Sequence, residues 1–292
     1  MKQGILYCFF LFLAAGVYGE TAIDLTGSIE WDQMEINVTV TLNLASAGIH
    51  LPTGRSLAEG TINDEYPRLV RPFLLSIPVD SSATLGDLVN RGEFSLYRVE
   101  HAALSARKVP SSLSGNLAFL SALYSINLNI ISTGLIQHSS PTEPIRTLTP
   151  APAPAYTGII IIANEALPIH GRNTATRSVP CIFPKIWDTN MNLIYERNMM
   201  DPKIAHTMVR YVSPDSIFRP TPSGLDPELA VLVGSNPLRI IARGVFGIHP
   251  TDPIIDREDA LLIISSENNR RLLREGRVAI VLNEGVLKSP IN

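Results

Sequence analysis

The stretch His138–Ala155, with the sequence HSSPTEPIRTLTPAPAPA, lies near the middle of the chain and combines five prolines with no apolar periodicity. Such a composition is typical of a semi-rigid, extended spacer, and its final Ala-Pro alternation favours polyproline II. The chain has 292 residues, of which 45% are hydrophobic, so it is long enough to build two packed cores. The sequence therefore predicts two domains, residues 20–137 and 156–292, joined by a Pro-rich linker at residues 138–155.

The pattern in the first half is typical of an antiparallel sheet. Apolar residues alternate with polar ones over 23–31 and again over 36–44, with Asp32-Gln33 between them, which predicts a hairpin with one buried face. A helix is expected from about Gly54 to Leu75, and its two prolines, Pro67 and Pro72, should kink or split it. Ser81 or Ser82 should cap a short helix through Val89, and residues 120–130 should form a strand. We therefore expect helices on one face of an antiparallel sheet.

Strands and helices alternate in the second half. Ile159–Ile162 is a run of four isoleucines, as expected of a strand that is covered on both faces. Further predicted strands are residues 181–187, 193–195, 238–242 and 277–282; residues 201–212 are a predicted helix, and Asp256 and Asp259 resemble a capping box. This half is therefore expected to be a mixed-sheet α/β domain, and the whole chain falls in the α+β class.

The first residues resemble an export signal. Lys2 precedes an apolar run from Ile5 to Val17, whose length suits a signal peptide better than a membrane span. Small residues end this run, so residues 1–19 are predicted to be removed and the mature protein to begin near Glu20. An uncleaved anchor helix is the alternative. No second apolar span follows, so no transmembrane segment is expected after cleavage.

Cysteine usage limits both anchoring and covalent stabilisation. Cys8 lies inside the apolar run and is a poor lipid acceptor, and after signal cleavage Cys181 stands alone. No internal disulfide is then possible, so burial must stabilise the fold. Cys181 lies between Pro180 and Ile182, which favours a small buried hydrophobe over a reactive thiol.

Motifs that carry chemistry are not evident. The sequence contains no Gly-rich phosphate loop, no GxGxxG, no GxSxG and no CxxC, and its six histidines are scattered without the i, i+4 spacing of a helical zinc site. The formal net charge of -3 argues against nucleic-acid binding, which usually requires a dense basic surface. The sequence therefore predicts no catalytic residue, no metal site and no cofactor.

Four arginines gather before the last predicted strand of the second domain: Arg270, Arg271, Arg274 and Arg277. Arg270, Arg274 and Arg277 would share one face if a helix ran through all three, although Gly276 opposes this. One interpretation is a site for an anionic partner, such as a phosphate, a carboxylate or an acidic subunit surface. The other is internal bracing, in which the arginines pair with Glu267 and Glu275 and their aliphatic stems cover the sheet.

Several stretches resemble the LPP20-like family of bacterial envelope proteins, which includes the flagellar protein FlgP. They are Tyr156–Ala163 (YTGIIIIA), Phe183–Asp188 (FPKIWD), Leu193–Glu196 (LIYE), Asn236–Ile240 (NPLRI) and Arg274–Val278 (REGRV), with Gly54-Arg55, Ala58-Glu59, Val79–Ser81 and Thr84 in the first half. The chain departs from that family at Asn164–Ala166, where a glycine-rich continuation is expected, and in having no acceptor cysteine. These motifs are strand cores and turns, so the resemblance carries over no binding residue.

The resemblance implies an exported, non-enzymatic protein. We therefore expect a structural or assembly component of the cell envelope, periplasmic or associated with the outer membrane, in some relatives part of a ring around the flagellar motor. Its expected partners are envelope proteins, including flagellar basal-body components, or further copies of itself. A periplasmic binding module for an anionic ligand is one alternative. A periplasmic hydrolase whose residues meet only in the folded protein is another.

Overall fold

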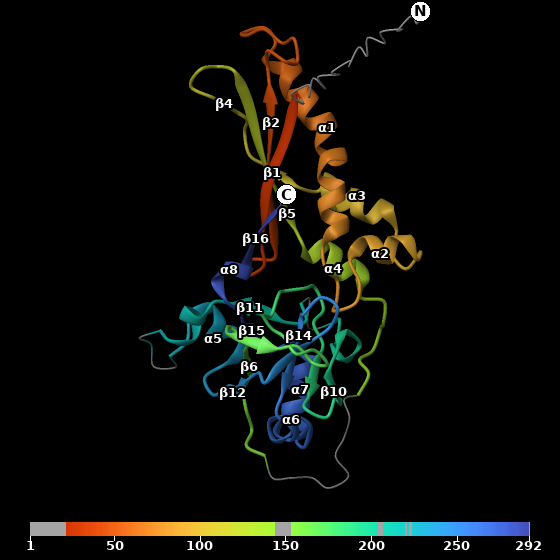
Figure 1. The fold of residues 1–292 in the computed structure, drawn as a ribbon, viewed down its shortest axis with the longest axis vertical. Helices are drawn as coiled ribbons and strands as arrows, with labels where there is room; N and C mark the ends of the chain where they lie inside the picture. Colours follow the sequence, from red (N-terminus) through yellow and green to blue (C-terminus); the bar gives the residue numbers. More distant parts are fainter. Residues whose placement is uncertain (1–21, 144–152, 204–206, 220, 222–223, 292) are drawn as a thin grey trace, which may run out of the picture.

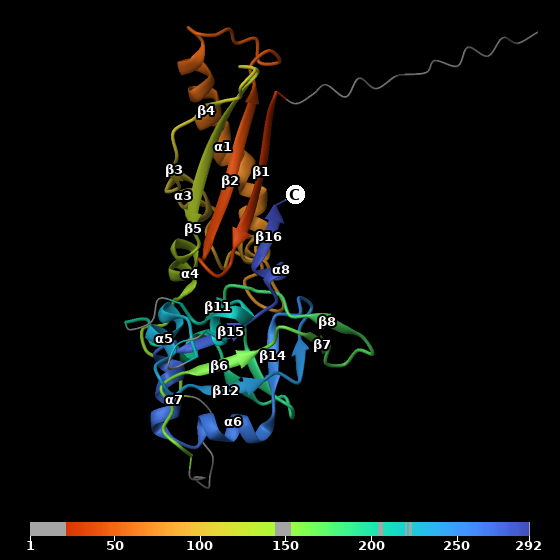
Figure 2. The same cartoon turned by 90° about the vertical axis from the view of Figure 1, so that its left-hand side faces the viewer.

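The computed structural model describes residues 22–143, 153–203, 207–219, 221 and 224–291. The predicted signal peptide and the central part of the predicted linker lie outside these residues. Two α+β units are stacked along the long axis of the molecule, an elongated N-terminal unit and a C-terminal unit with several small sheets (Figures 1 and 2). The predicted α+β class, with an antiparallel first sheet and mixed sheets in the second unit, is confirmed.

The N-terminal unit is built on one six-stranded antiparallel sheet in the order β16-β1-β2-β5-β3, with β4 also paired to β5. Its strands are β1 (Ile23–Glu30), β2 (Glu35–Asn43), β3 (Arg107–Lys108), β4 (Ser112–Leu113), β5 (Phe119–Asn127) and β16 (Lys288–Ile291). The predicted hairpin is confirmed, since β1 and β2 pair in register from Ile23–Leu42 to Glu30–Glu35. Alternate residues of β2 are buried under the helices, as the period of two requires. The predicted strand at 120–130 ends earlier, because Leu128 begins a helix.

Four helices lie on one side of this sheet: α1 (Arg55–Ser76), α2 (Leu85–Asn90), α3 (Leu96–Leu104) and α4 (Asn129–Leu135). The helices α1 and α3 pack on the sheet, α2 packs on α1, and α4 packs on α3. The predicted helix is confirmed, and of the two expected effects of its prolines, kinking or splitting, splitting is wrong, since α1 continues through Pro67 and Pro72. Its buried residues, Ala58, Ile62, Tyr66, Val70 and Leu74, recur every four positions and pack on the sheet. This packing outweighs the backbone hydrogen bonds that the prolines remove.

The cap of α2 also differs from the prediction. Thr84, rather than Ser81 or Ser82, caps this helix: its side chain accepts from the Asp87 amide, and the Asp87 carboxylate accepts from the Thr84 amide. Such a reciprocal arrangement satisfies two amide donors that have no partner within the helix. Ser81 is instead buried at the boundary with the C-terminal unit.

The C-terminal unit contains a parallel sheet in the order β11-β15-β6-β12, a mixed sheet in the order β10-β9-β14-β13, and the hairpin β7-β8. Its strands are β6 (Ile159–Ile162), β7 (Ala166–Pro168), β8 (Ala175–Arg177), β9 (Ile186–Asp188), β10 (Leu193–Tyr195), β11 (Arg210–Val212), β12 (Leu238–Ile241), β13 (Gly244–Phe246), β14 (Asp252–Ile255) and β15 (Val278–Val281). Its α-helices are α5 (Pro227–Val233), α6 (Arg257–Ile264), α7 (Glu267–Arg274) and α8 (Glu284–Leu287), and 3-10 turns occupy Arg197–Met199 and Pro214–Ile217.

The run of isoleucines is covered on both faces, as predicted. Ile160 packs in a small cluster with Leu229 and Val233 of α5, whereas Ile159 and Ile161 face the main core. β6 lies between β15 and β12 and pairs with both in parallel. A strand with two buried faces explains a continuous apolar run in place of alternation.

Three local predictions in this unit are wrong. The predicted helix at 201–212 contains β11, whose Tyr211 and Val212 are buried beside β15. The predicted strand at 181–187 shortens to β9, because the amides of Ile182 and Phe183 donate to Pro78 and Val79 of the N-terminal unit instead. Asp256 precedes α6 but makes no capping hydrogen bond, because its carboxylate pairs with Arg243 at 2.6 Å.

One continuous hydrophobic cluster extends through both units, from Trp31 and Ile36 in the first to Ile161 and Leu273 in the second. The chain also returns at its end: β16 leaves the C-terminal unit and pairs with β1 of the first sheet. The last residues of the range 156–292 therefore belong, in space, to the N-terminal sheet. No helix among the described residues has both the length and the apolarity needed to cross a membrane.

Candidate functional site

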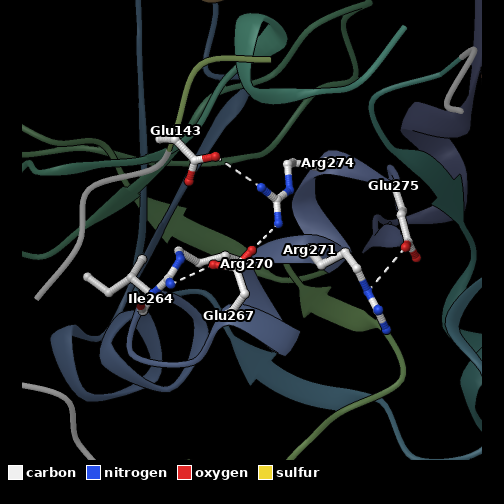
Figure 3. A network of polar contacts seen from close by, with 7 residues as sticks. All are labelled: Glu143, Ile264, Glu267, Arg270, Arg271, Arg274 and Glu275. Carbon is white, nitrogen blue, oxygen red and sulfur yellow. Dashed lines mark hydrogen bonds and ion pairs between the residues drawn. The ribbon is translucent and has the colours of Figure 1, made fainter. Parts of the chain in front are cut away.

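Three of the four arginines, Arg270, Arg271 and Arg274, lie on α7 and are shown in Figure 3. The Arg270 side chain is 10% exposed and donates to the carbonyl of Ile264 at 2.5 Å and to Glu267 at 2.7 Å. Ile264 is the last residue of α6, so Arg270 satisfies a carbonyl at the end of the preceding helix. This guanidinium therefore joins α6 to α7 and faces the interior.

Arg274 connects α7 to the start of the predicted linker. Its guanidinium pairs with Glu143 at 3.0 Å and also with Glu267. Glu267 thus accepts from two arginines, and the hydrogen bonds from Arg270 and then Arg274 lower the pKa of its carboxyl below the ordinary value.

The start of the predicted linker is held by further hydrogen bonds. The amide of Thr142 donates to the Asn198 carbonyl, and His138 bonds the Met200 carbonyl. Residues 138–143 are therefore held along the C-terminal unit.

The other two arginines lie apart from this pair. Arg271 is 60% exposed and pairs with Glu275 at 3.3 Å, on the other side of α7. Arg277 is not on the helix, because α7 ends at Arg274 and Gly276 adopts a positive φ of 63°. Its Nε donates to the carbonyl of Leu232 in α5 at 2.9 Å. The structure thus brings together Arg270 and Arg274, but not all four arginines.

The partners that the four guanidinium groups already have favour internal bracing over an anion site. All four arginines use donors on the protein's own carboxylates or carbonyls, including both glutamates that the bracing interpretation named. An anion at Arg270 or Arg274 would have to displace Glu267, a carboxylate already in place. Arg271 is the most exposed of the four, yet a single exposed guanidinium makes a weak anion site.

A second group of functional interest is the junction between the two units, at the loop that follows α1. Here the Ser81 carbonyl accepts from the amides of Ile248 and His249, at 2.9 and 3.0 Å. The Pro78 and Val79 carbonyls accept from Ile182 and Phe183, at 3.1 and 2.8 Å. This loop of the N-terminal unit therefore enters the C-terminal unit and makes backbone hydrogen bonds there.

A buried carboxylate lies beneath this loop. Asp252 has no exposed surface, and its oxygens accept from the Lys185 amide at 3.0 Å, the Thr251 hydroxyl at 2.9 Å and the Trp187 indole at 3.2 Å. Burial raises the pKa of this carboxyl above the ordinary value, although hydrogen bonds, led by one from Ser81, act in the opposite direction. Asp252 thus helps to fasten a loop from the other unit.

The single cysteine of the described chain lies next to this group and is a structural residue. Cys181 is buried, and burial raises the pKa of its thiol well above the ordinary value. Its backbone amide and carbonyl both bond the Tyr211 hydroxyl, at 3.1 and 2.8 Å. A buried thiol of raised pKa is a poor nucleophile, which agrees with the prediction of a small hydrophobe. Tyr211 in turn packs edge-on against Trp31 of the N-terminal unit.

Within the described residues, no three His, Cys, Asp or Glu side chains are grouped as a metal ion would require. Sequence reasoning did not find the junction residues Ser81, Asp252 and Tyr211. Asp252 precedes the apolar residues Pro253, Ile254 and Ile255, a stretch for which the sequence analysis predicted no strand, and a carboxylate next to such a stretch was the available signal.

Comparison with known families gives two matched stretches, and the gap between them contains the predicted linker at residues 138–155. Residues 22–133 match the family described as the N-terminal domain of Treponema pallidum Tp0624, and residues 158–284 match the family described as its second domain. The chain resembles Tp0624 in two consecutive domains. The two matched stretches follow each other in the order that those descriptions give. No match to a curated protein was found. The resemblance to LPP20-like proteins stays a prediction, since the matched families are those of Tp0624.

Proposed function

We propose that this protein is a non-catalytic structural component of the bacterial cell envelope, exported and periplasmic or associated with the outer membrane. In this role its two domains act as one rigid body that holds envelope partners at a fixed distance and orientation. The arrangement differs from two domains held apart by the predicted semi-rigid spacer, because the two domains share one core.

The observation that carries this proposal is the reciprocal connection between the domains. The loop containing Ser81 enters the C-terminal domain, and β16 returns from that domain to pair with β1. Each domain thus completes a part of the other. A scaffold requires such rigidity, because partners bound at the two ends keep their spacing only if the body between them does not bend.

Photo-cross-linking in intact cells of the source organism tests the role. A photoreactive amino acid replaces Tyr97 on α3 or Val231 on α5, which are 72% and 84% exposed and belong to different domains. We expect both positions to capture defined envelope proteins, with the same proteins recovered in repeated experiments. A matched control places the same group at buried Val99 or Leu229, which lie on the same two helices and should capture nothing.

Two results would count against the proposal. One is recovery of the protein in the cytoplasmic fraction. The other is a fixed set of cytoplasmic or metabolic partners at both exposed positions. Turnover of a periplasmic substrate by the purified protein would instead favour the hydrolase alternative, which depends on residues that meet only in the fold.

A further inference from the structure

The first sheet has an outer edge that is only half covered. β16 pairs with β1 from Gly27 to Glu30, and in the described part of the chain the preceding residues of β1, Ile23–Thr26, pair with β2 alone. Figure 2 shows β16 beside the lower half of β1, with the upper half forming the margin of the sheet. A strand edge of this kind is a template for pairing with another chain.

Two hydrogen bonds show which backbone groups point outward along β1. The Ala22 carbonyl accepts from the Asn43 amide at 2.7 Å, so it points toward β2, whereas the Trp31 amide donates to Leu287, beside β16. Backbone direction alternates along an antiparallel strand. The amides and carbonyls of Ile23 and Leu25 therefore point outward, in line with the groups that pair with β16 further along.

The part of this sheet edge that β16 covers and the part that it leaves uncovered differ in how readily a further strand can pair there. Pro290 of β16 lies opposite Ser28 and has no amide hydrogen, so the outer side of β16 lacks a donor there and resists a further strand. On the uncovered part, the Leu25 amide donates to the Asp24 carboxylate at 2.9 Å in an exposed contact. An arriving strand can displace this contact, because the carboxylate remains solvated when it leaves.

The side chains around the open edge define the partner. Ile23 and Leu25 are partly buried on the face that carries the helices, whereas Asp24 and Thr26 are exposed on the opposite face. We propose that Ile23–Thr26 bind an extended partner segment that continues the row begun by β16, with apolar residues on the helix side and a basic residue beside Asp24. This inference rests on the proposed function only in requiring that a partner exists, and it uses strand addition as the mode of binding.

A synthetic probe tests the edge directly. The probe is a fluorescein-labelled heptapeptide in which lysine and valine alternate, and its control has the same composition with the lysines and valines in separate blocks. Fluorescence anisotropy should show binding of the alternating peptide and at least ~10-fold weaker binding of the block peptide. The peptide should also slow hydrogen exchange at the amides of Ile23 and Leu25.

Variants separate pairing from general loss of structure. Leu25→Pro removes an outward-pointing amide but no hydrogen bond to β2, so peptide binding should fall about 10-fold or more while the protein stays folded. Leu25→Val keeps the amide and should bind as the wild type does. Asp24→Arg reverses an exposed charge and removes the contact with the Leu25 amide, and the charge reversal should weaken binding of the lysine peptide most at low salt.

Three results would overturn the proposal: equal binding by wild type and Leu25→Pro, no exchange protection at Ile23 and Leu25, or a homodimer that Leu25→Pro abolishes. The last result would assign the edge to a second copy of the chain. If peptide binding fails while cells still yield envelope cross-links from Tyr97 and Val231, the edge proposal is wrong and the scaffold role stands. Peptide binding at the edge without envelope cross-links from Tyr97 and Val231 would refute the scaffold role and leave the edge as a binding site.

Discussion

The two interpretations of the arginine cluster make opposite predictions for Arg270→Met. Methionine keeps an unbranched aliphatic stem at this buried position and removes the guanidinium. That guanidinium donates to the Ile264 carbonyl at 2.5 Å and to Glu267 at 2.7 Å, and its side chain is 10% exposed. If the cluster is an internal brace, its loss should destabilise the fold.

The contacts set the size of the effect. A hydrogen bond from a charged donor contributes ~1.5–3 kcal/mol, and leaving the Ile264 carbonyl without this partner forfeits that amount. Glu267 is 55% exposed, so its pairing with Arg270 adds at most ~1 kcal/mol. We therefore expect a loss of ~2–4 kcal/mol in the free energy of unfolding. For a chain of 292 residues, with an unfolding entropy of about 2.1 cal/mol/K per residue, this loss lowers the melting temperature by roughly 3–7 °C.

Arg271→Met is the matched control, since it makes the same change at the next residue of α7. Arg271 is 60% exposed and pairs with Glu275 at 3.3 Å, so the loss should be below ~1 kcal/mol. Thermal unfolding by circular dichroism, with and without inorganic phosphate, distinguishes the interpretations. Equal melting temperatures for both variants, or phosphate stabilisation of the wild type that Arg270→Met abolishes, would refute the bracing interpretation.

Three further outcomes are expected. Gly247 has a φ of 123° and a Cβ there would overlap Ser81, so Gly247→Ala should destabilise the domain junction by ~2 kcal/mol or more. The control Gly60→Ala lies in open space on α1 and should stabilise the fold by up to ~1 kcal/mol. Urea unfolding measures both, and an unchanged free energy of unfolding for Gly247→Ala would contradict the junction. Because burial raises the folded-state pKa of Asp252, its ionisation costs stability as the pH rises through that pKa. The stability of the wild type relative to Asp252→Asn should therefore increase as the pH falls through that pKa, and a decrease in that difference would contradict this sign. N-terminal sequencing of envelope material should begin near Glu20, and recovery of the initiator methionine would contradict signal cleavage.

Short-range patterns predicted the strands that have one clear period. The β1–β2 hairpin followed from alternation, and β6 from four consecutive isoleucines, because each pattern is set by which faces of the strand are buried. The continuity of α1 did not follow in the same way. Its two prolines argue locally against a helix, and only packing of the stripe from Ala58 to Leu74 on the sheet reverses that preference.

Residues 201–212 also show that local patterns can be overridden by tertiary structure: a helix was predicted here, and the structure has a strand. Pro202 near the start of a stretch favours a helix by local rules, yet Arg210–Val212 pairs with β15 in a parallel sheet. A parallel partner lies far away in sequence, and no local period records it. Of the three arginines expected to share a helical face, Arg270 and Arg274 lie on α7 and Arg277 lies beyond its end. The carbonyl partner at Ile264 and the distant carboxylate at Glu143 come from tertiary structure.

The pairing of β16 with β1 limits how far the two similarities to Tp0624 can be treated as independent folding units. The second matched stretch ends at residue 284, and β16 begins at Lys288, so neither match includes the strand that completes the first sheet. An isolated N-terminal stretch would lack this strand, which leaves Gly27–Glu30 open and exposes the apolar side of Ile29. It would also present the carbonyls of Pro78, Val79 and Ser81 without the amides that they accept from. The two domains are therefore separable in sequence comparison but interdependent in stability, and a mutation at the junction should weaken both together.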